Sequence, residues 1–243
     1  MRRPIVWVLL AGSLSSGCPP RPESPGAGQP APRPSQAEIA PQPLGEPGYL
    51  PVAPGQSIAA DAALAPARAD PAPSWKEVSR AQVALEGGPL QLVILELPGS
   101  GAGLVLLRPE GTGRRVINTY GIRWDGLGVE MVVRGQWTSP DRRAALLLLQ
   151  VDRESRGYQA TPGDESSAVE AETSRSWVVL GVTAARAWLA APELNRHTAA
   201  RFQPQPDALR LVACVSRTSA EVFELSPSTL TFGAAHPAPG PCP

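Results

Sequence analysis

Proline is the residue that most restricts what this chain can fold into. The 29 prolines of the 243-residue chain are spread unevenly and crowd the stretch that follows Cys18. This stretch is also rich in Ala, Gly and Gln and poor in large apolar side chains, so it cannot bury enough surface to offset its ordering entropy. We therefore expect residues 18–73 to be a disordered linker that begins at Cys18, and residues 74–243 to form the folded domain.

A proline-rich linker is a stiff spacer. In the polyproline II conformation it rises about 3.1 Å per residue, so some 50 residues reach on the order of 100 Å. The segment Pro30–Pro34 is also compatible with a ligand for a polyproline-binding groove. Tyr49–Val52 is an apolar island in the linker, and we expect it to dock on the domain as an edge segment.

The N-terminus has the pattern of a secretory signal peptide. Arg2 and Arg3 precede an apolar core, Ile5–Ala11, which is too short to span a bilayer because a spanning helix needs about 20 apolar residues. Small residues, Ser15–Gly17, stand directly before Cys18. The sequence therefore predicts a signal peptide over residues 1–17.

Residues 14–18, Leu-Ser-Ser-Gly-Cys, resemble the lipobox of bacterial lipoproteins. The resemblance implies cleavage before Cys18 and acylation of its thiol with diacylglycerol, hence export and a lipid anchor in a membrane. Leu14 lies four places before the Cys, where the family has Leu three places before it, and ordinary secretion is the alternative. Pro19 stands where Asp often marks inner-membrane retention in that family, so the resemblance implies the outer membrane, with the domain facing the periplasm or the surface.

The charge of the chain is balanced. It has 22 basic and 22 acidic residues and a formal charge of zero. A balanced chain has no long-range field to steer it onto nucleic acid. We expect no nucleic-acid partner.

The folded part is predicted to be mainly β, an antiparallel sandwich or barrel-like domain with one or two short helices. Apolar runs of strand length alternate with turn signals about every ten residues. Asp125-Gly126 predicts a hairpin, and Val129, Met131, Val133 and Trp137 are predicted to share one buried face. The expected strands are 90–97, 103–108, 116–124, 129–137, 144–152, 177–182, 209–216, 222–225 and 230–232.

Three segments favour helix in the sequence. Ser74–Glu77 fits a capping box and predicts a helical turn that leads into a strand. Residues Thr183–Ala191 suit a short helix that Pro192 stops, and Glu193–Phe202 suits a second one.

Two cysteines remain once Cys18 is set aside. In an oxidising compartment we expect Cys214 and Cys242 to pair, which stabilises the fold by roughly 3.6 kcal/mol in the chain-entropy model for a loop of about 29 residues. A zinc site would need them together with His197 and His236, but no close ligand pair is present,. The sequence predicts no metal or cofactor, and both histidines are expected to be exposed.

The sequence offers no catalytic set. No G-x-S-x-G elbow is present,, and Gly99–Gly103 is expected to be a hairpin loop. Trp124 is the one candidate for stacking on a ligand such as a sugar ring, although burial in the core is the expected role for a Trp. Carboxylates are available, but their spacing singles out no pair: Asp125, Glu130, Asp141, Asp152 and Glu154.

These patterns predict a non-enzymatic lipoprotein of the cell envelope. Its domain would be held off a membrane by the linker and would bind or support an envelope protein or a glycan. The alternatives are a secreted hydrolase of envelope polymers and a carbohydrate-binding module.

Overall fold

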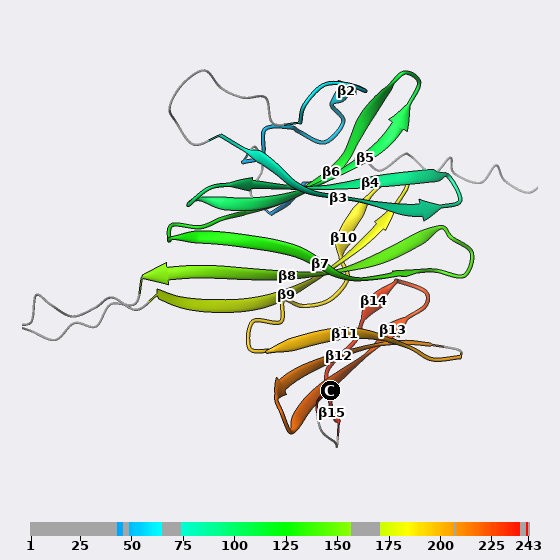
Figure 1. The fold of residues 1–243 in the computed structure, drawn as a ribbon. Coiled ribbons are helices and arrows are strands. Elements are labelled where there is room, and N and C mark those ends of the chain that lie inside the picture. Colours follow the sequence, from blue (N-terminus) through cyan, green and yellow to red (C-terminus); the bar gives the residue numbers. More distant parts are fainter. Residues whose placement is uncertain are drawn as a thin grey trace, which may run out of the picture. The chain divides into compact units, whose positions relative to one another are not determined.

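The computed structural model describes residues 43–45, 49–64, 74–156, 171–206, 208–238 and 242. They all belong to one compact unit. The described residues form strands, turns and loops, and none of them is helical. The mainly-β class predicted from the sequence is confirmed (Figure 1).

The strands form three sheets, named A, B and C here (Figure 1). Sheet A has the order β1-β6-β5-β4-β3, with β2 also paired to β6: β1 (Leu44–Gly45), β2 (Ser57–Ala59), β3 (Lys76–Leu85), β4 (Gly88–Leu97), β5 (Gly101–Glu110) and β6 (Gly113–Arg123). Sheet B has the order β10-β9-β8-β7: β7 (Gly128–Thr138), β8 (Ala144–Arg156), β9 (Ala171–Thr183) and β10 (Ala187–Leu189). Sheet C has the order β11-β12-β13-β14, with β15 also paired to β13: β11 (Ala199–Pro204), β12 (Leu209–Ser216), β13 (Ser219–Ser226), β14 (Thr231–Phe232) and β15 (His236–Ala238).

Sheets A and B pack face to face as a β-sandwich. Side chains at alternate positions of both sheets meet in one core, because successive residues of a strand point to opposite faces. Sheet A contributes residues such as Leu92 and Leu104, and sheet B contributes residues such as Leu147 and Val178. β1 pairs with β6 in parallel, whereas every other strand pair in the described residues is antiparallel.

Sheet B is covered on both faces. In β8, Leu147 and Leu149 pack toward sheet A, whereas Leu146 and Leu148 pack toward sheet C. All four leucines are at most 1% exposed. A strand that is buried on both faces has a continuous run of apolar residues. This run is why the sequence predicts a strand over 144–152.

The outer face of sheet A is covered by the segment 49–64. Leu50, Val52, Ile58 and Leu64 of this segment share a core with sheet A side chains. Tyr49–Val52 therefore docks on the domain, but over the face of sheet A and not as the edge segment that we expected, and residues before 74, the boundary drawn from composition, pack on the sheet. Composition missed it because a few apolar side chains among prolines and alanines are enough to cover one sheet face.

The two helices expected near residue 190 are wrong. Thr183 donates its backbone N–H to the carbonyl of Arg186 at 2.8 Å and closes a turn from β9 into β10. The Trp188 ring then lies on the backbone of its cross-strand partner Gly181, where an added Cβ would come within 2.1 Å of the ring. Residues 199–204 form β11 instead of the second helix. Pairing with β9 and β12 outweighs the helix propensity of the alanines.

The helical turn expected at Ser74–Glu77 is wrong as well. β3 begins at Lys76, and Glu77 pairs with Leu95 of β4. Pairing of this segment with the apolar strand β4 outweighs the local preference of Ser74–Glu77 for a helical turn.

The turn at Asp125-Gly126 carries the chain from one sheet to the other. β6 belongs to sheet A and β7 to sheet B, so the predicted hairpin is wrong. The predicted shared face of β7 is only partly correct, because Val129 and Met131 pack in the A–B core and Trp137 packs toward sheet C. A bulge between Val133 and Gly135 adds one residue, and one residue moves every later side chain to the other face.

Candidate functional site

A groove of about 670 Å³ opens at one end of the A–B sandwich. Sheet A supplies its first wall from β3, β4 and the turn into β5, and sheet B supplies the second wall from β7 and the ends of β8 and β9. The lining residues are Val78, Ser79, Ile94, Leu95, Glu96, Pro98, Gly99, Ala102, Leu127, Gly128, Val129, Glu130, Met131, Val132, Asp152, Glu154 and Thr173.

The groove runs along the free edge of β7. The lining includes six consecutive residues, 127–132, although Val129 and Met131 point into the A–B core and Glu130 and Val132 point to the other face. Both faces of a strand can line one groove only if the groove follows the strand's edge. In the described residues, β7 is paired with β8 alone.

The charge of the groove is negative. Four of its lining residues are acidic and none is basic. Asp152 is neutralised by Arg175, whose Nε and Nη2 donate to the carboxylate at 2.7 and 2.9 Å. This hydrogen bond, helped by one from Gln150, lowers the pKa of Asp152.

The other three carboxylates are Glu96, Glu130 and Glu154. Within the part of the chain that the structure describes, they form no ion pair and no side-chain hydrogen bond, although the charge of Glu130 acts on Arg175 and raises its pKa together with Asp152. Glu130, Asp152 and Glu154 were candidate carboxylates from the sequence, which does not bring them together, and Glu96 was not among those candidates. Glu96 is the one charge in the apolar run of β4, and that was the available signal.

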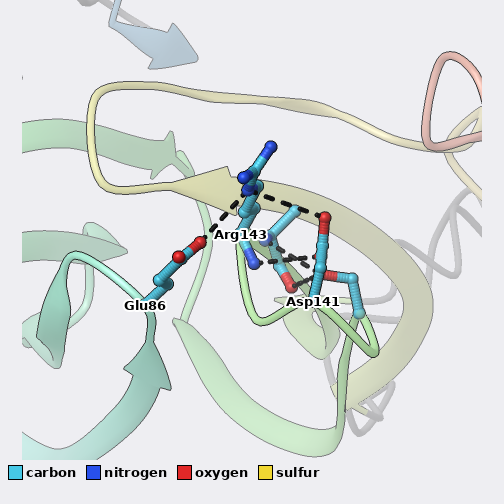
Figure 2. Close-up of polar contacts among 5 residues, drawn as sticks. Glu86, Asp141 and Arg143 are labelled. Carbon is cyan, nitrogen blue, oxygen red and sulfur yellow. Dashed lines mark hydrogen bonds and ion pairs between the residues drawn. The ribbon is translucent and has the colours of Figure 1, made fainter.

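At the opposite end of the sandwich, polar contacts between two turns hold sheets A and B together. The β3–β4 turn meets the β7–β8 turn there: Arg143 Nε donates to Glu86 Oε2 at 3.1 Å, and the Arg143 backbone N–H donates to Asp141 Oδ1 (Figure 2). The Ser139 hydroxyl donates to the same Asp141 oxygen at 2.6 Å and lowers the pKa of Asp141. Asp141 therefore serves the turn and lies away from the groove.

Trp124 is half-buried beside the groove, and it packs against the A–B core. Its Nε1–H donates to the carbonyl of Glu154 at 2.8 Å. The guanidinium of Arg153 lies over the indole, 5.9 Å from the ring centroid. The N–H and one face of the ring are thus occupied within the chain, so the expected core role describes Trp124 better than a stacking platform does.

Arg153 links Trp124 to the inner face of sheet B. It donates to Ser176 Oγ at 2.7 Å and to Glu193 Oε1 at 3.1 Å. Burial next to this cluster, with the charge of Glu193, raises the pKa of Tyr120 to about 12. These groups are satisfied by one another and serve as a structural network.

The remaining predicted residues lie in or near sheet C. Cys214 and Cys242 form the expected disulfide, with Cα atoms 5.8 Å apart. His197 is 4% exposed, contrary to the expected exposure, because its Nε2 lies 3.0 Å from Glu221 Oε2 and its ring packs against Phe223. His236 is exposed in β15.

The predicted lipid anchor and the expected absence of a metal site concern parts of the chain outside the groove. Cys18 and the predicted signal peptide lie outside the described residues. Over the ranges that the structure covers, no three His, Cys, Asp or Glu side chains are grouped to hold a metal ion, and no helix there has the length and apolar character to cross a membrane. Comparison of the chain with protein-family models, curated proteins and solved structures found no match.

Proposed function

We propose that the chain is an exported lipoprotein whose β-sandwich domain binds another component of the cell envelope through the groove beside β7. The signal-peptide pattern and Cys18 support the anchor. The proline-rich stretch after Cys18 supports a spacer that holds the domain away from the membrane,.

The groove carries the proposal of binding. In the part of the chain that the structure describes, it joins an apolar wall, three carboxylates without ion-pair partners and an unpaired strand edge in one concave surface. Two large apolar side chains stand exposed at its rim, Val78 at 52% and Leu127 at 37%. Concave surfaces that mix apolar walls with a few charged groups are where proteins bind ligands, and exposed apolar residues at the rim extend the contact area.

The anchor is tested by the intact mass of the mature protein extracted from its native membrane. We expect a mass that begins at Cys18 and includes acyl chains, and we expect Cys18→Ser to abolish the acylation. An unmodified mass that begins at or after Cys18 would mean a free secreted protein and would overturn the anchor.

The groove is tested by photo-crosslinking in the living envelope. A photoreactive residue in place of Leu127 should give a discrete crosslinked product. The matched control is Leu189, another exposed apolar residue, which lies in β10 at the far edge of sheet B. Crosslinks of equal yield and identity at both positions, or none at Leu127, would contradict a binding site in the groove.

The carboxylates also favour one alternative, a hydrolase of envelope polymers. Glycoside hydrolysis uses two carboxyl groups on either side of the scissile bond, and Glu96 stands on the wall opposite Glu130 and Glu154. Turnover of peptidoglycan or polysaccharide that Glu130→Gln abolishes would favour the hydrolase over the binding module.

A further inference from the structure

The two open edges beside the groove differ in how well they are protected. β3, the edge of sheet A, carries Lys76, Glu77 and Arg80 and a bulge between Glu77 and Ser79. Charges and bulges are the devices by which proteins prevent an edge strand from pairing with another chain. β3 is therefore a protected edge.

The first half of β7 lacks this protection. Between Gly128 and Val133 the one charged residue is Glu130, and the pairing with β8 is regular. The bulge of β7 lies beyond this stretch, next to Gly135, where an added Cβ would contact Phe202 of β11 at 3.5 Å. Sheet C thus lies near the far half of β7 and leaves the half along the groove open.

The two sides of this edge have different chemistry. On the core side, Val129 and Met131 of β7 face Ile94 and Ala102 of sheet A across the groove. On the other side of the sheet, Glu130 lies near the end of β8 that carries Glu154. An added strand would therefore place every second side chain against apolar groups and the intervening ones near carboxylates.

We propose that the groove binds an extended peptide segment of a partner protein, with alternating apolar and basic side chains, which adds to sheet B as a strand next to residues 128–133. This inference rests on the proposed function and names the class of ligand for the same site. The six residues of the open edge accommodate about 20 Å of extended chain. Main-chain hydrogen bonds to β7 supply affinity, and the alternate side chains supply specificity.

The charge selects a basic segment. Among the described residues Glu130 and Glu154 have no ion-pair partner, so a peptide cation can pair with either of them, whereas Asp152 is already held by Arg175. Glu96 lies on the core side of the groove, with Ala102 as its cross-strand partner. An acidic segment would meet like charges at each of these positions, and like-charge contacts suppress the wrong partner.

The experiment uses the full-length mature chain and four synthetic seven-residue peptides. The first alternates Arg and Val, and the second replaces each Arg with Glu. The other two are copies of the first in which the amides of either all Arg residues or all Val residues are N-methylated. We expect the first peptide to bind and the acidic one not to bind. Alternate amides of a strand point in opposite directions, so one methylated copy should lose binding and the other should keep it.

The location is read from hydrogen exchange and from variants. Bound peptide should slow amide exchange in residues 128–133 and leave β3 unchanged. The double variant Glu130→Gln, Glu154→Gln should bind about fivefold more weakly, since each exposed ion pair contributes modestly, and the loss should shrink at high salt. The control changes two carboxylates outside the groove, Glu110→Gln and Glu224→Gln, with the same change in net charge; it should bind like the parent.

Each outcome has a defined meaning. Equal binding of the basic and acidic peptides, loss of binding in both methylated copies or in neither, or protection in β3 would overturn strand addition to β7. Failure of all peptides together with crosslinks from Leu127 would overturn this inference and leave the proposed binding function intact. Failure of both experiments would overturn both.

Discussion

The backbone N–H of Glu86 donates to the carbonyl oxygen of Arg142 at 2.8 Å and joins the end turns of sheets A and B. The Glu86–Arg143 ion pair lies beside this bond (Figure 2). Both of its side chains are more than 60% exposed, so the ion pair contributes little. The backbone hydrogen bond and the A–B core hold the two sheets together at this end. The groove lies at the opposite end.

Arg142 accepts this bond in a strained conformation, since its φ is +54°. A non-glycine residue in the left-handed region costs about 1 kcal/mol. Arg142→Gly should therefore increase the free energy of unfolding by about 0.5–1 kcal/mol, measured by denaturant titration.

Gly111 provides the matched control for that prediction. Its φ is +56°, and an added Cβ would meet no other atom within 4 Å. Gly111→Ala should lower the free energy of unfolding by about 1 kcal/mol through backbone strain alone. A destabilised Arg142→Gly variant would mean that the guanidinium contributes more than the strain costs.

The strands of the sandwich could be predicted because their signals are local. Apolar runs such as Leu90–Leu97 and Ala144–Asp152 lie between turn residues, and burial on both faces made them continuous. The short strands could not be predicted, because β10 is three residues long and depends on Gly181 to receive the Trp188 ring. Local propensity at alanine-rich segments favours helix until a neighbouring strand is placed beside them.

The groove could not be predicted for a related reason. Its walls come from sheets whose contact is set by the crossing at Asp125-Gly126, and a hairpin there would have placed β6 and β7 in one sheet. Because of this crossing, Glu96 and Glu130 lie on opposite walls of the groove, and their positions in the sequence give no indication of that. The cysteine pair was predictable because only two cysteines remained after Cys18, which left one pairing.

The disulfide should secure the C-terminal end of the chain without determining the fold. Cys214 lies in β12 with 6% exposure, whereas Cys242 lies beyond β15 and donates its backbone N–H to the Arg217 carbonyl. For a separation of 28 residues, the chain-entropy model gives a stabilisation of roughly 3.6 kcal/mol. Cys242→Ser should lower the free energy of unfolding by up to that amount and speed proteolysis after β15. Unchanged cleavage of this tail under reducing conditions would show that β15 pairing alone holds it.

Tyr120 should ionise well above the pH at which a tyrosine ordinarily does. Burial favours the neutral phenol and raises its pKa from 10.0 to about 12,. Because the folded chain holds this proton more tightly than the unfolded chain does, its contribution to stability is complete below pH 10 and is lost as the pH rises toward 12. Phenolate absorbance should show a phase near pH 12 that Tyr120→Phe removes. A Tyr120→Phe profile identical to that of the parent would contradict the buried position.

The contact between Gly103 and Leu50 tests whether the segment 49–64 belongs to the domain. A Cβ added at Gly103 would come within 2.2 Å of Leu50 Cδ2, and all three of its nearest neighbours are atoms of the Leu50 side chain. Gly103→Ala should lower the free energy of unfolding by about 1–3 kcal/mol through overpacking, and Leu50→Ala by about 2–3 kcal/mol.

The double variant tests whether Leu50 packs against Gly103, because Leu50→Ala removes the atoms with which the new methyl group would clash. We expect the double variant to lose at least about 1 kcal/mol less than the sum of the single losses, as neighbouring residues do. Ile58→Ala is the control: Ile58 pairs with Arg114, at the other end of β6 from Gly121, the partner of Gly103. Its loss should add to that of Gly103→Ala. Additivity for Leu50 as well would mean that residues 49–52 do not pack on sheet A in solution, and that the linker extends to residue 73 as composition alone suggests.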